Sequence, residues 1–164
     1  MLRWGLRLFA AVVLVALLTL GAGQAGLLQG SAPATLGVQG GRLAPPSESP
    51  NSVSSQAGLW PGHPQAAAAQ IAPLPARGDA ATTMARLRDA VAALPGAEIV
   101  EARADYVYAR FTTRWLRFVD DAEFWFDPAA GVVQLRSASR VGRSDLGVNR
   151  ARIEALRAAW AAAG

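Results

Sequence analysis

The stretch "DDAEFWFDPAAGVVQLRS", residues 120–137, decides the fold because its pattern predicts two strands joined by a turn. Apolar residues recur at every second position in both halves, as expected for strands that bury one face. Between the halves, Pro128 presets φ and Gly131 accepts positive φ, which suits a turn. A short connection of this kind predicts antiparallel pairing. The shared apolar face consists of Ala122, Phe124, Phe126, Val133 and Leu135.

Two further strands are predicted upstream, in residues 98–104 and 106–113, because apolar and polar residues alternate there as well. Phe111 from the second of these strands joins the apolar face of the hairpin. The opposite face gathers aromatic rings and arginines. They can stack sugars or bases or form cation–π pairs, and the alternative is a second small core beneath the proline-rich segment. Its members are Tyr106, Tyr108, Arg110, Trp125 and Arg136.

A helix is predicted on each side of the four strands. The first begins after Asp79, which can accept hydrogen bonds from the free N–H groups of the first turn, and ends at the Pro-Gly pair 95–96. The second begins near Val148, with Ser144 or Asn149 as its candidate cap. The two apolar stripes consist of Met84, Leu87, Val91 and Leu94 in the first helix, and Ile153, Leu156 and Trp160 in the second.

The order helix, four strands, helix predicts an α+β fold. We expect a two-layer sandwich, with a four-stranded antiparallel sheet and both helices on one face, over residues 79–162. The other face is expected to be partly solvated or covered by the proline-rich segment. A signal or transmembrane segment is expected to precede this domain.

The N-terminal residues 1–28 are typical of a signal peptide or a membrane anchor. Arg3 and Arg7 precede an apolar run over residues 8–20, and small residues follow. The positive-inside rule keeps the two arginines in the cytoplasm and directs the rest of the chain outward. The protein is therefore expected to be exported. Anchorage in the inner membrane and release into the periplasm or the medium, by cleavage after Gly23 or Ala25, both remain open.

Eight of the ten prolines lie between residues 33 and 75, a composition that disfavours long helices and central strands. We expect residues 29–43 to be a flexible linker. The folded domain is expected to span residues 44–164, with 44–78 as an irregular proline-rich part that clamps onto the folded body.

Composition excludes several kinds of site. The chain has no cysteine, which excludes disulfides and thiolate metal ligands, and His63 is its one histidine. The net charge of +4 is too small to indicate nucleic-acid binding. All sixteen basic residues are arginine, so arginine content by itself is weak support for a phosphate site.

Four motifs of this chain resemble domain of unknown function family 1499 (DUF1499), over roughly residues 44–159. They are "SPNSVSS", "IAPLP", "FVDDAEFWFD" and "RSASRVGRSDLGVNRARIEALR". Members of the family often carry a signal peptide, a lipoprotein signal or a membrane segment, so the resemblance implies a membrane address here too. The family usually has cysteine where this chain has Ser52. The family has no assigned reaction, so the resemblance implies a module without naming its chemistry.

The stretch "RSASRVGRSDLGVNR", residues 136–150, is the first candidate site, because arginines gather beside a predicted helix N-terminus. Free N–H groups and bidentate arginines suit an anion, either a small molecule or a lipid headgroup. The alternative is a structural loop whose polar groups satisfy each other and whose arginines pair with the acidic strand. The candidate residues are Arg136, Ser139, Arg140, Arg143, Ser144, Asp145 and Asn149.

Asp120, Asp121 and Glu123 form the second candidate site. Asp121 and Glu123 share a strand face and have the oxygens that a hard cation prefers, but two strand carboxylates supply few ligands. The alternative is pairing with arginines of neighbouring strands, such as Arg110 or Arg136.

The sequence thus predicts an exported or membrane-anchored envelope protein that acts as a binding or structural module. An envelope protein is a candidate partner. No catalytic residue and no metal or organic cofactor is assigned. The alternative function is a hydrolase of envelope material that uses Asp121 and Glu123, with or without a divalent cation.

Overall fold

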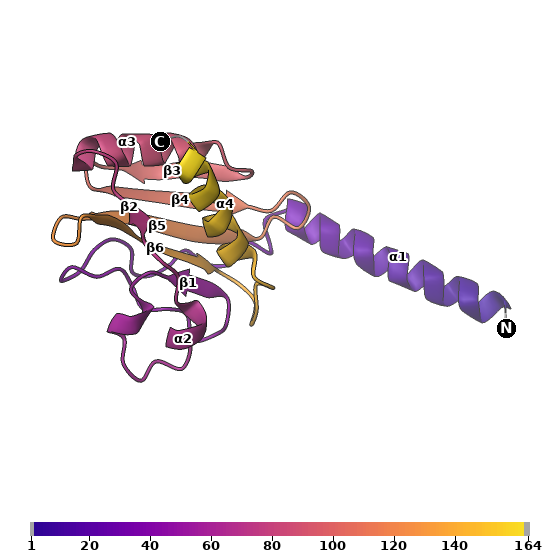
Figure 1. Ribbon diagram of the computed structural model, residues 1–164. Helices are drawn as coiled ribbons and strands as arrows, with labels where there is room; N and C mark the ends of the chain where they lie inside the picture. Colours follow the sequence, from indigo (N-terminus) through magenta and orange to yellow (C-terminus); the bar gives the residue numbers. More distant parts are fainter. Residues whose placement is uncertain (1, 163–164) are drawn as a thin grey trace.

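The computed structural model describes residues 2–162, which form a domain of helices and strands with one long helix projecting from it (Figure 1). The helices are α1 (Leu2–Gln24), the 3-10 helix η1 (Ala57–Leu59), α2 (Ala66–Ala69), α3 (Ala80–Ala92) and α4 (Val148–Ala162). The strands are β1 (Ser52–Ser54), β2 (Leu74–Pro75), β3 (Ala97–Ala102), β4 (Tyr106–Thr112), β5 (Val119–Asp127) and β6 (Val132–Ser139). The predicted α+β class is confirmed.

The sheet is antiparallel and follows the order β1-β6-β5-β4-β3, with β2 also paired to β6. The predicted number of four strands is wrong, because the described sheet has six. The two additional strands come from the proline-rich segment. Strand β1 pairs with Arg136–Ala138, and β2 pairs with Val132–Val133, so both lie along the outer edge of β6. Proline is tolerated on such an edge because its missing N–H need not join a central ladder.

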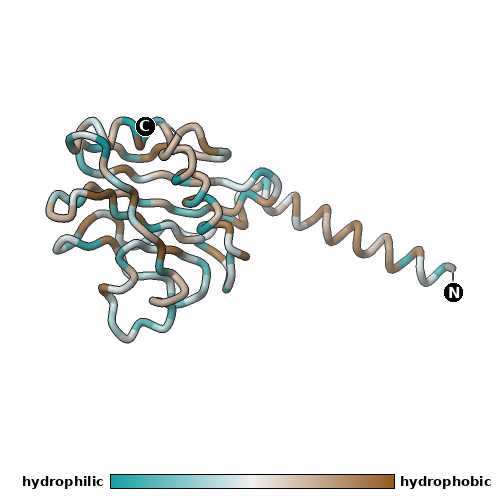
Figure 2. The backbone as a smooth tube through the Cα atoms, in the orientation of Figure 1, coloured by the Kyte–Doolittle hydropathy of each residue, from teal (hydrophilic) through white to brown (hydrophobic). Residues whose placement is uncertain are grey.

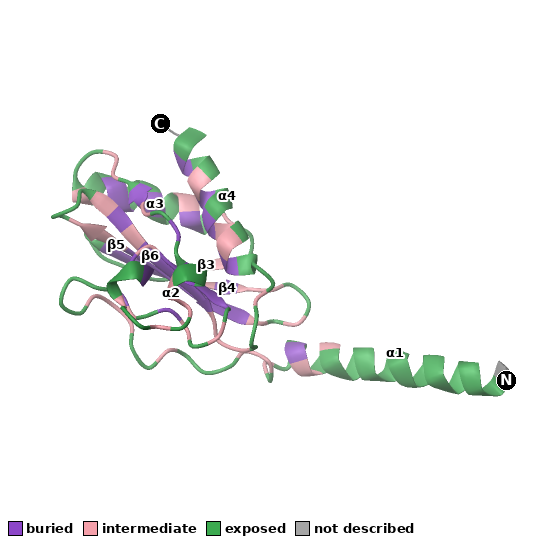
Figure 3. Cartoon of the chain, turned by 60° about the horizontal axis from the view of Figure 1, so that its bottom comes forward, coloured by how far each residue is buried: buried purple, intermediate pink, exposed green. Residues whose placement is uncertain are grey.

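Both helices α3 and α4 cover one face of the sheet, as predicted (Figures 1 and 3). Asp79 caps α3 by accepting from the Thr82 N–H at 2.7 Å, and the predicted stripe packs inward. The main core therefore joins the helix stripes to the apolar face of the hairpin. It includes Met84, Leu87, Val91, Phe111, Ala122, Phe124, Val133, Leu135, Ile153, Leu156 and Trp160.

The opposite face of the sheet carries a second small core. Tyr106 and Tyr108 are buried there, and Trp125 packs beside them. Their cover is provided by Leu36, Val38 and the fully buried Leu43. Much of the segment expected to be a linker thus packs on the sheet, because these three apolar side chains find aromatic partners.

Helix α1 projects away from the domain and is exposed over most of its length (Figures 2 and 3). Residues Arg3–Gln24 are long and apolar enough to cross a membrane, and none of the apolar window is buried against the domain. Its C-terminal end is the exception. Gly23 is buried, and a Cβ there would lie only 2.6 Å from the Leu116 carbonyl oxygen. Beside it, the Gln24 amide donates to the Trp115 carbonyl at 2.8 Å.

Candidate functional site

Three carboxylates of β5, Asp120, Asp121 and Glu123, each face an arginine. Asp120 pairs with Arg152 of α4, which approaches from the helix face of the sheet. On the opposite face, Asp121 pairs with Arg140 and Glu123 lies opposite Arg136. All three carboxyl groups are buried, so the acidic cluster faces internal arginines and not solvent. Among residues 2–162, no group of three or more histidine or acidic side chains is placed to hold a metal ion.

The Asp121 pair has the strongest geometry. Arg140 donates through Nε to Oδ2 and through Nη2 to Oδ1, both at 2.8 Å, which is the bidentate form. The Tyr108 hydroxyl also donates to Oδ1. The hydrogen bonds to Asp121 raise the pKa of Arg140, and burial raises the pKa of Tyr108 to about 12. The network therefore occupies both carboxylate oxygens of Asp121 with hydrogen bonds from the protein itself.

Glu123 is less well compensated. Its Oε1 accepts from the Tyr106 hydroxyl at 2.8 Å and from the Gly37 N–H at 2.7 Å. Its Oε2 has no hydrogen-bond partner and lies 4.0 Å from Nη1 of Arg136. Burial raises the pKa of Glu123 more than these partners lower it, and burial also lowers the pKa of Arg136. The fold thus makes this carboxyl easier to protonate than a glutamate in water.

Asn149 links the first turn of α4 to the sheet. Its amide donates to the Asn51 carbonyl, to Ser139 Oγ at 3.0 Å and to Asp145 Oδ2 at 3.0 Å. Its Oδ1 accepts from Ser137 and from Arg152. The side chain is fully buried, so it satisfies polar groups of three segments at once.

The N-terminus of α4 is capped by Asp145, and the expected cap by Ser144 or Asn149 is wrong. Asp145 accepts from the Gly147 N–H at 3.0 Å and from the Asn149 N–H at 2.9 Å. Burial alone would raise the pKa of Asp145, but these hydrogen bonds lower it overall. The protein's own carboxylate therefore occupies the helix terminus that was a candidate anion site.

Among the candidate anion-binding residues of β6 and the loop that follows it, one arginine has no partner within the protein, whereas its neighbours do. Arg136 donates to the Pro45 carbonyl at 2.9 Å, and Arg140 is engaged by Asp121. Ser139 binds Asn149, and Ser144 accepts from the Leu146 N–H at 3.2 Å. Arg143 is exposed and forms no ion pair with any residue in the range 2–162.

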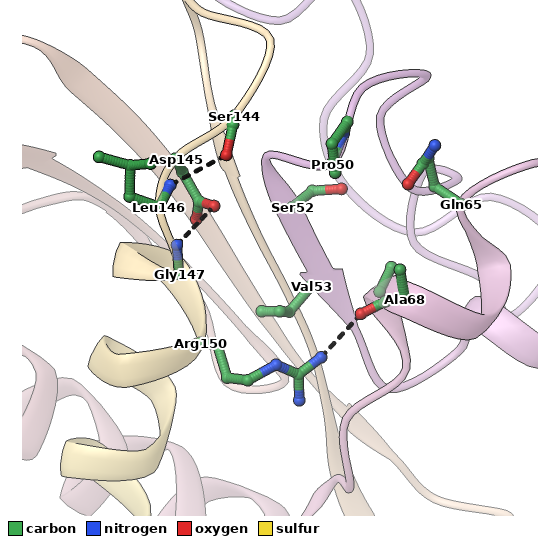
Figure 4. Close-up of a pocket in the computed structure, with 11 residues that line it drawn as sticks. Pro50, Ser52, Val53, Gln65, Ala68, Ser144, Asp145, Leu146, Gly147 and Arg150 are labelled. Atoms are coloured by element: carbon green, nitrogen blue, oxygen red, sulfur yellow. Dashed lines mark hydrogen bonds between the residues drawn. The ribbon is translucent and has the colours of Figure 1, made fainter.

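A cavity of about 270 Å³ lies between this loop, β1 and α2 (Figure 4). Ser52 is among its lining residues. The charged groups in its wall are already used, because Arg150 donates to the Ala68 and Gln70 carbonyls and Asp145 caps α4. The cavity is slightly smaller than typical small-molecule sites. It offers hydrogen-bonding groups and the Arg150 guanidinium, which donates to backbone carbonyls and forms no ion pair within residues 2–162.

A different cluster lies at the end of the domain where α1 joins it. The loop between β4 and β5, residues 113–118, exposes Arg114, Trp115 and Arg117. The Trp115 residue is 63 % exposed and Leu146, in the neighbouring loop, is 94 % exposed. Sequence reasoning missed this cluster. Its signal was the "RWLR" stretch, in which arginines flank apolar residues outside any predicted strand.

Comparison with known proteins gives a family and no function. A family model described as "Protein of unknown function (DUF1499)" matches residues 42–160. Searches of curated proteins and of solved structures gave no significant match.

Proposed function

This chain belongs to the DUF1499 family of proteins of unknown function, and from its structure we propose that it is an exported, membrane-anchored module. In this proposal α1 spans the membrane and the domain binds or organises material at the cell envelope. The observation that carries it is the exposed apolar helix Arg3–Gln24, which the domain leaves uncovered. A helix with that composition is unfavourable in water and favourable in a bilayer.

The junction between α1 and the domain supports an anchor over a cleaved signal. A removable signal needs no specific contact with the mature protein. Here Gly23 packs closely on Leu116, and Gln24 donates to the Trp115 carbonyl. Arg3 and Arg7 at the other end of α1 favour a cytoplasmic N-terminus, so the domain lies outside the cytoplasm.

A binding or structural role is better supported than hydrolysis. A hydrolase of the predicted kind needs Asp121 and Glu123 to reach a substrate. Instead, both side chains are almost fully buried. Asp121 pairs with Arg140, and Glu123 accepts a hydrogen bond from the Gly37 N–H. Glu123 has the raised pKa of a general acid, but it lies in a closed environment.

The proposal is tested by fractionating cells that express the full chain. Membranes are washed with alkaline carbonate, and intact cells or spheroplasts are treated with protease. We expect the uncleaved chain in the membrane pellet and the domain degraded from outside. A chain found in the soluble fraction at reduced mass contradicts anchorage, and a domain protected from external protease contradicts export.

A further inference from the structure

We infer that the end of the domain around α1 is a membrane-contact surface that binds anionic lipid headgroups. This inference rests on the proposed anchorage of α1 and adds how the domain is oriented on the bilayer. The surface, termed here the juxtamembrane end, comprises loop 113–118 and loop 140–147. Both loops lie at the end of the sheet from which α1 projects, whereas the β5–β6 turn lies at the opposite end (Figure 1).

The position of the juxtamembrane end follows from contacts with α1. The close approach of Gly23 to Leu116 fixes loop 113–118 beside the last turn of α1. The chain then passes the second loop, because a Cβ at Gly30 would lie 2.7 Å from Val141. If α1 spans the bilayer to Gln24, both loops therefore lie within side-chain reach of the headgroup region.

The side chains at this end are those that favour a membrane interface. Trp115 is 63 % exposed, Leu146 is 94 % exposed and Leu27, just after α1, is 76 % exposed. Tryptophan is enriched at the headgroup level, where its ring is partly apolar and its N–H stays wet. Leu146 has a φ of 53°, an unusual conformation for leucine.

The charges at this end fit an anionic surface. Arg114, Arg117 and Arg143 are exposed, and none forms an ion pair within residues 2–162. Arg114 also lies over the Trp115 ring at 4.9 Å. The nearby carboxylates are occupied, since Asp120 pairs with Arg152 and Asp145 caps α4. Unpaired arginines close to a bilayer are attracted to lipid phosphates.

A hollow between the two loops adds apolar surface. It has a volume of about 400 Å³, and Phe118, Val141, Leu146 and Val148 contribute to its wall. On a soluble domain this surface would face water. Placed on the headgroup region, it meets the upper part of the acyl chains, which gives the apolar loop residues a favourable environment.

The test uses the full chain in nanodiscs and exploits its lack of cysteine. Leu146→Cys places a single label at the juxtamembrane end, and Ala130→Cys places one in the exposed β5–β6 turn at the other end. Each variant carries a polarity-sensitive fluorophore, and acrylamide, a neutral quencher, reports exposure to water. Discs contain phosphatidylcholine alone or with phosphatidylglycerol.

We expect several-fold less quenching at position 146 than at 130 in discs that contain phosphatidylglycerol, and a smaller difference in phosphatidylcholine. The double variant Arg114→Gln/Arg117→Gln should abolish this lipid dependence. Arg86→Gln/Arg88→Gln, which removes the same charge from the exposed face of α3, should leave it intact.

Equal quenching at 146 and 130 in both lipids overturns the inference. Protection at position 146 that is independent of lipid charge and unchanged in both double variants overturns the headgroup part of the inference. A protein partner or apolar contact alone would then explain the surface. Either result is separate from a failure of anchorage, which appears as a chain that does not enter discs and is released from membranes by carbonate.

Discussion

Arg140 clamps Asp121 with two hydrogen bonds of 2.8 Å, across a side-chain pair that is almost completely shielded from water. Removing one partner leaves the other charge buried. We therefore expect Arg140→Met to lower the free energy of unfolding by about 3 kcal/mol. Denaturant unfolding of the full chain in a mild detergent measures this loss. Combining it with Asp121→Asn should cost less than the sum of the two single changes, and simple additivity would contradict the coupling.

Among residues 140–149, the Asn149 side chain is expected to contribute most to stability after that of Arg140. Asn149→Ala removes the acceptor of the buried Ser137 hydroxyl and one of the two donors to the Asn51 carbonyl. We expect a loss of about 2 kcal/mol in the free energy of unfolding. Ser144→Ala is the matched control, because Ser144 is exposed and should change stability by less than about 0.5 kcal/mol. Equal effects of the two changes would contradict the assigned role.

Glu123 makes stability depend on pH in a predictable direction. Because burial raises its pKa in the folded state, the fold binds this proton more tightly than the unfolded chain does. That stabilisation is complete below the unfolded glutamate pKa of about 4.3 and is lost as pH rises through the folded value. We compare wild type with Glu123→Gln, which does not titrate. Wild type should become more stable relative to Glu123→Gln as pH falls from about 8 to about 4.

A pH-independent difference between these two proteins would contradict the raised pKa of Glu123. The comparison removes the contribution of all other titrating groups, since both proteins share them.

Two glycines near the end of α1 form a natural matched pair. A Cβ at Gly23 meets backbone atoms of Leu116 at 2.6–2.9 Å, whereas a Cβ at Gly21 meets nothing within 4 Å. Both changes to alanine favour the helix by about 1 kcal/mol. Only Gly23→Ala should displace loop 113–118, at a cost of roughly 1–3 kcal/mol in the local stability of this junction. Hydrogen exchange of the loop amides measures this, and similar exchange in both variants would contradict the contact.

The local pattern of the sequence predicted the central part of the fold. The alternation in residues 120–137 placed Phe124, Val133 and Leu135 on the helix-covered face, and the turn residues gave the antiparallel pairing. Strands β1 and β2 escaped prediction because three and two residues are too short for any period to appear. They exist only through long-range pairing with β6, which no local signal encodes.

The candidate site was predictable in kind but not in full detail. Pairing of the acidic cluster with Arg110 or Arg136 was the alternative to a metal site, and Arg136 is the register partner of Glu123. Arg110, also considered as a partner for this cluster, pairs with Glu98 instead. The Asp120 partner, Arg152, comes from α4, and its contact depends on how the helix docks on the sheet. Docking of this kind is a tertiary property, so spacing in the sequence could not supply it.

The buried end of α1 bears on whether a signal peptidase could remove this helix. A signal peptidase that cuts after Gly23 or Ala25 must bind this stretch as an unfolded strand, because proteases act on locally opened chain. In the finished protein Gly23 is helical and buried on loop 113–118. Cutting and folding therefore compete for the same residues. Under the proposed anchorage, a chain whose domain closes first would keep α1, and slower closure would leave this stretch open to cleavage.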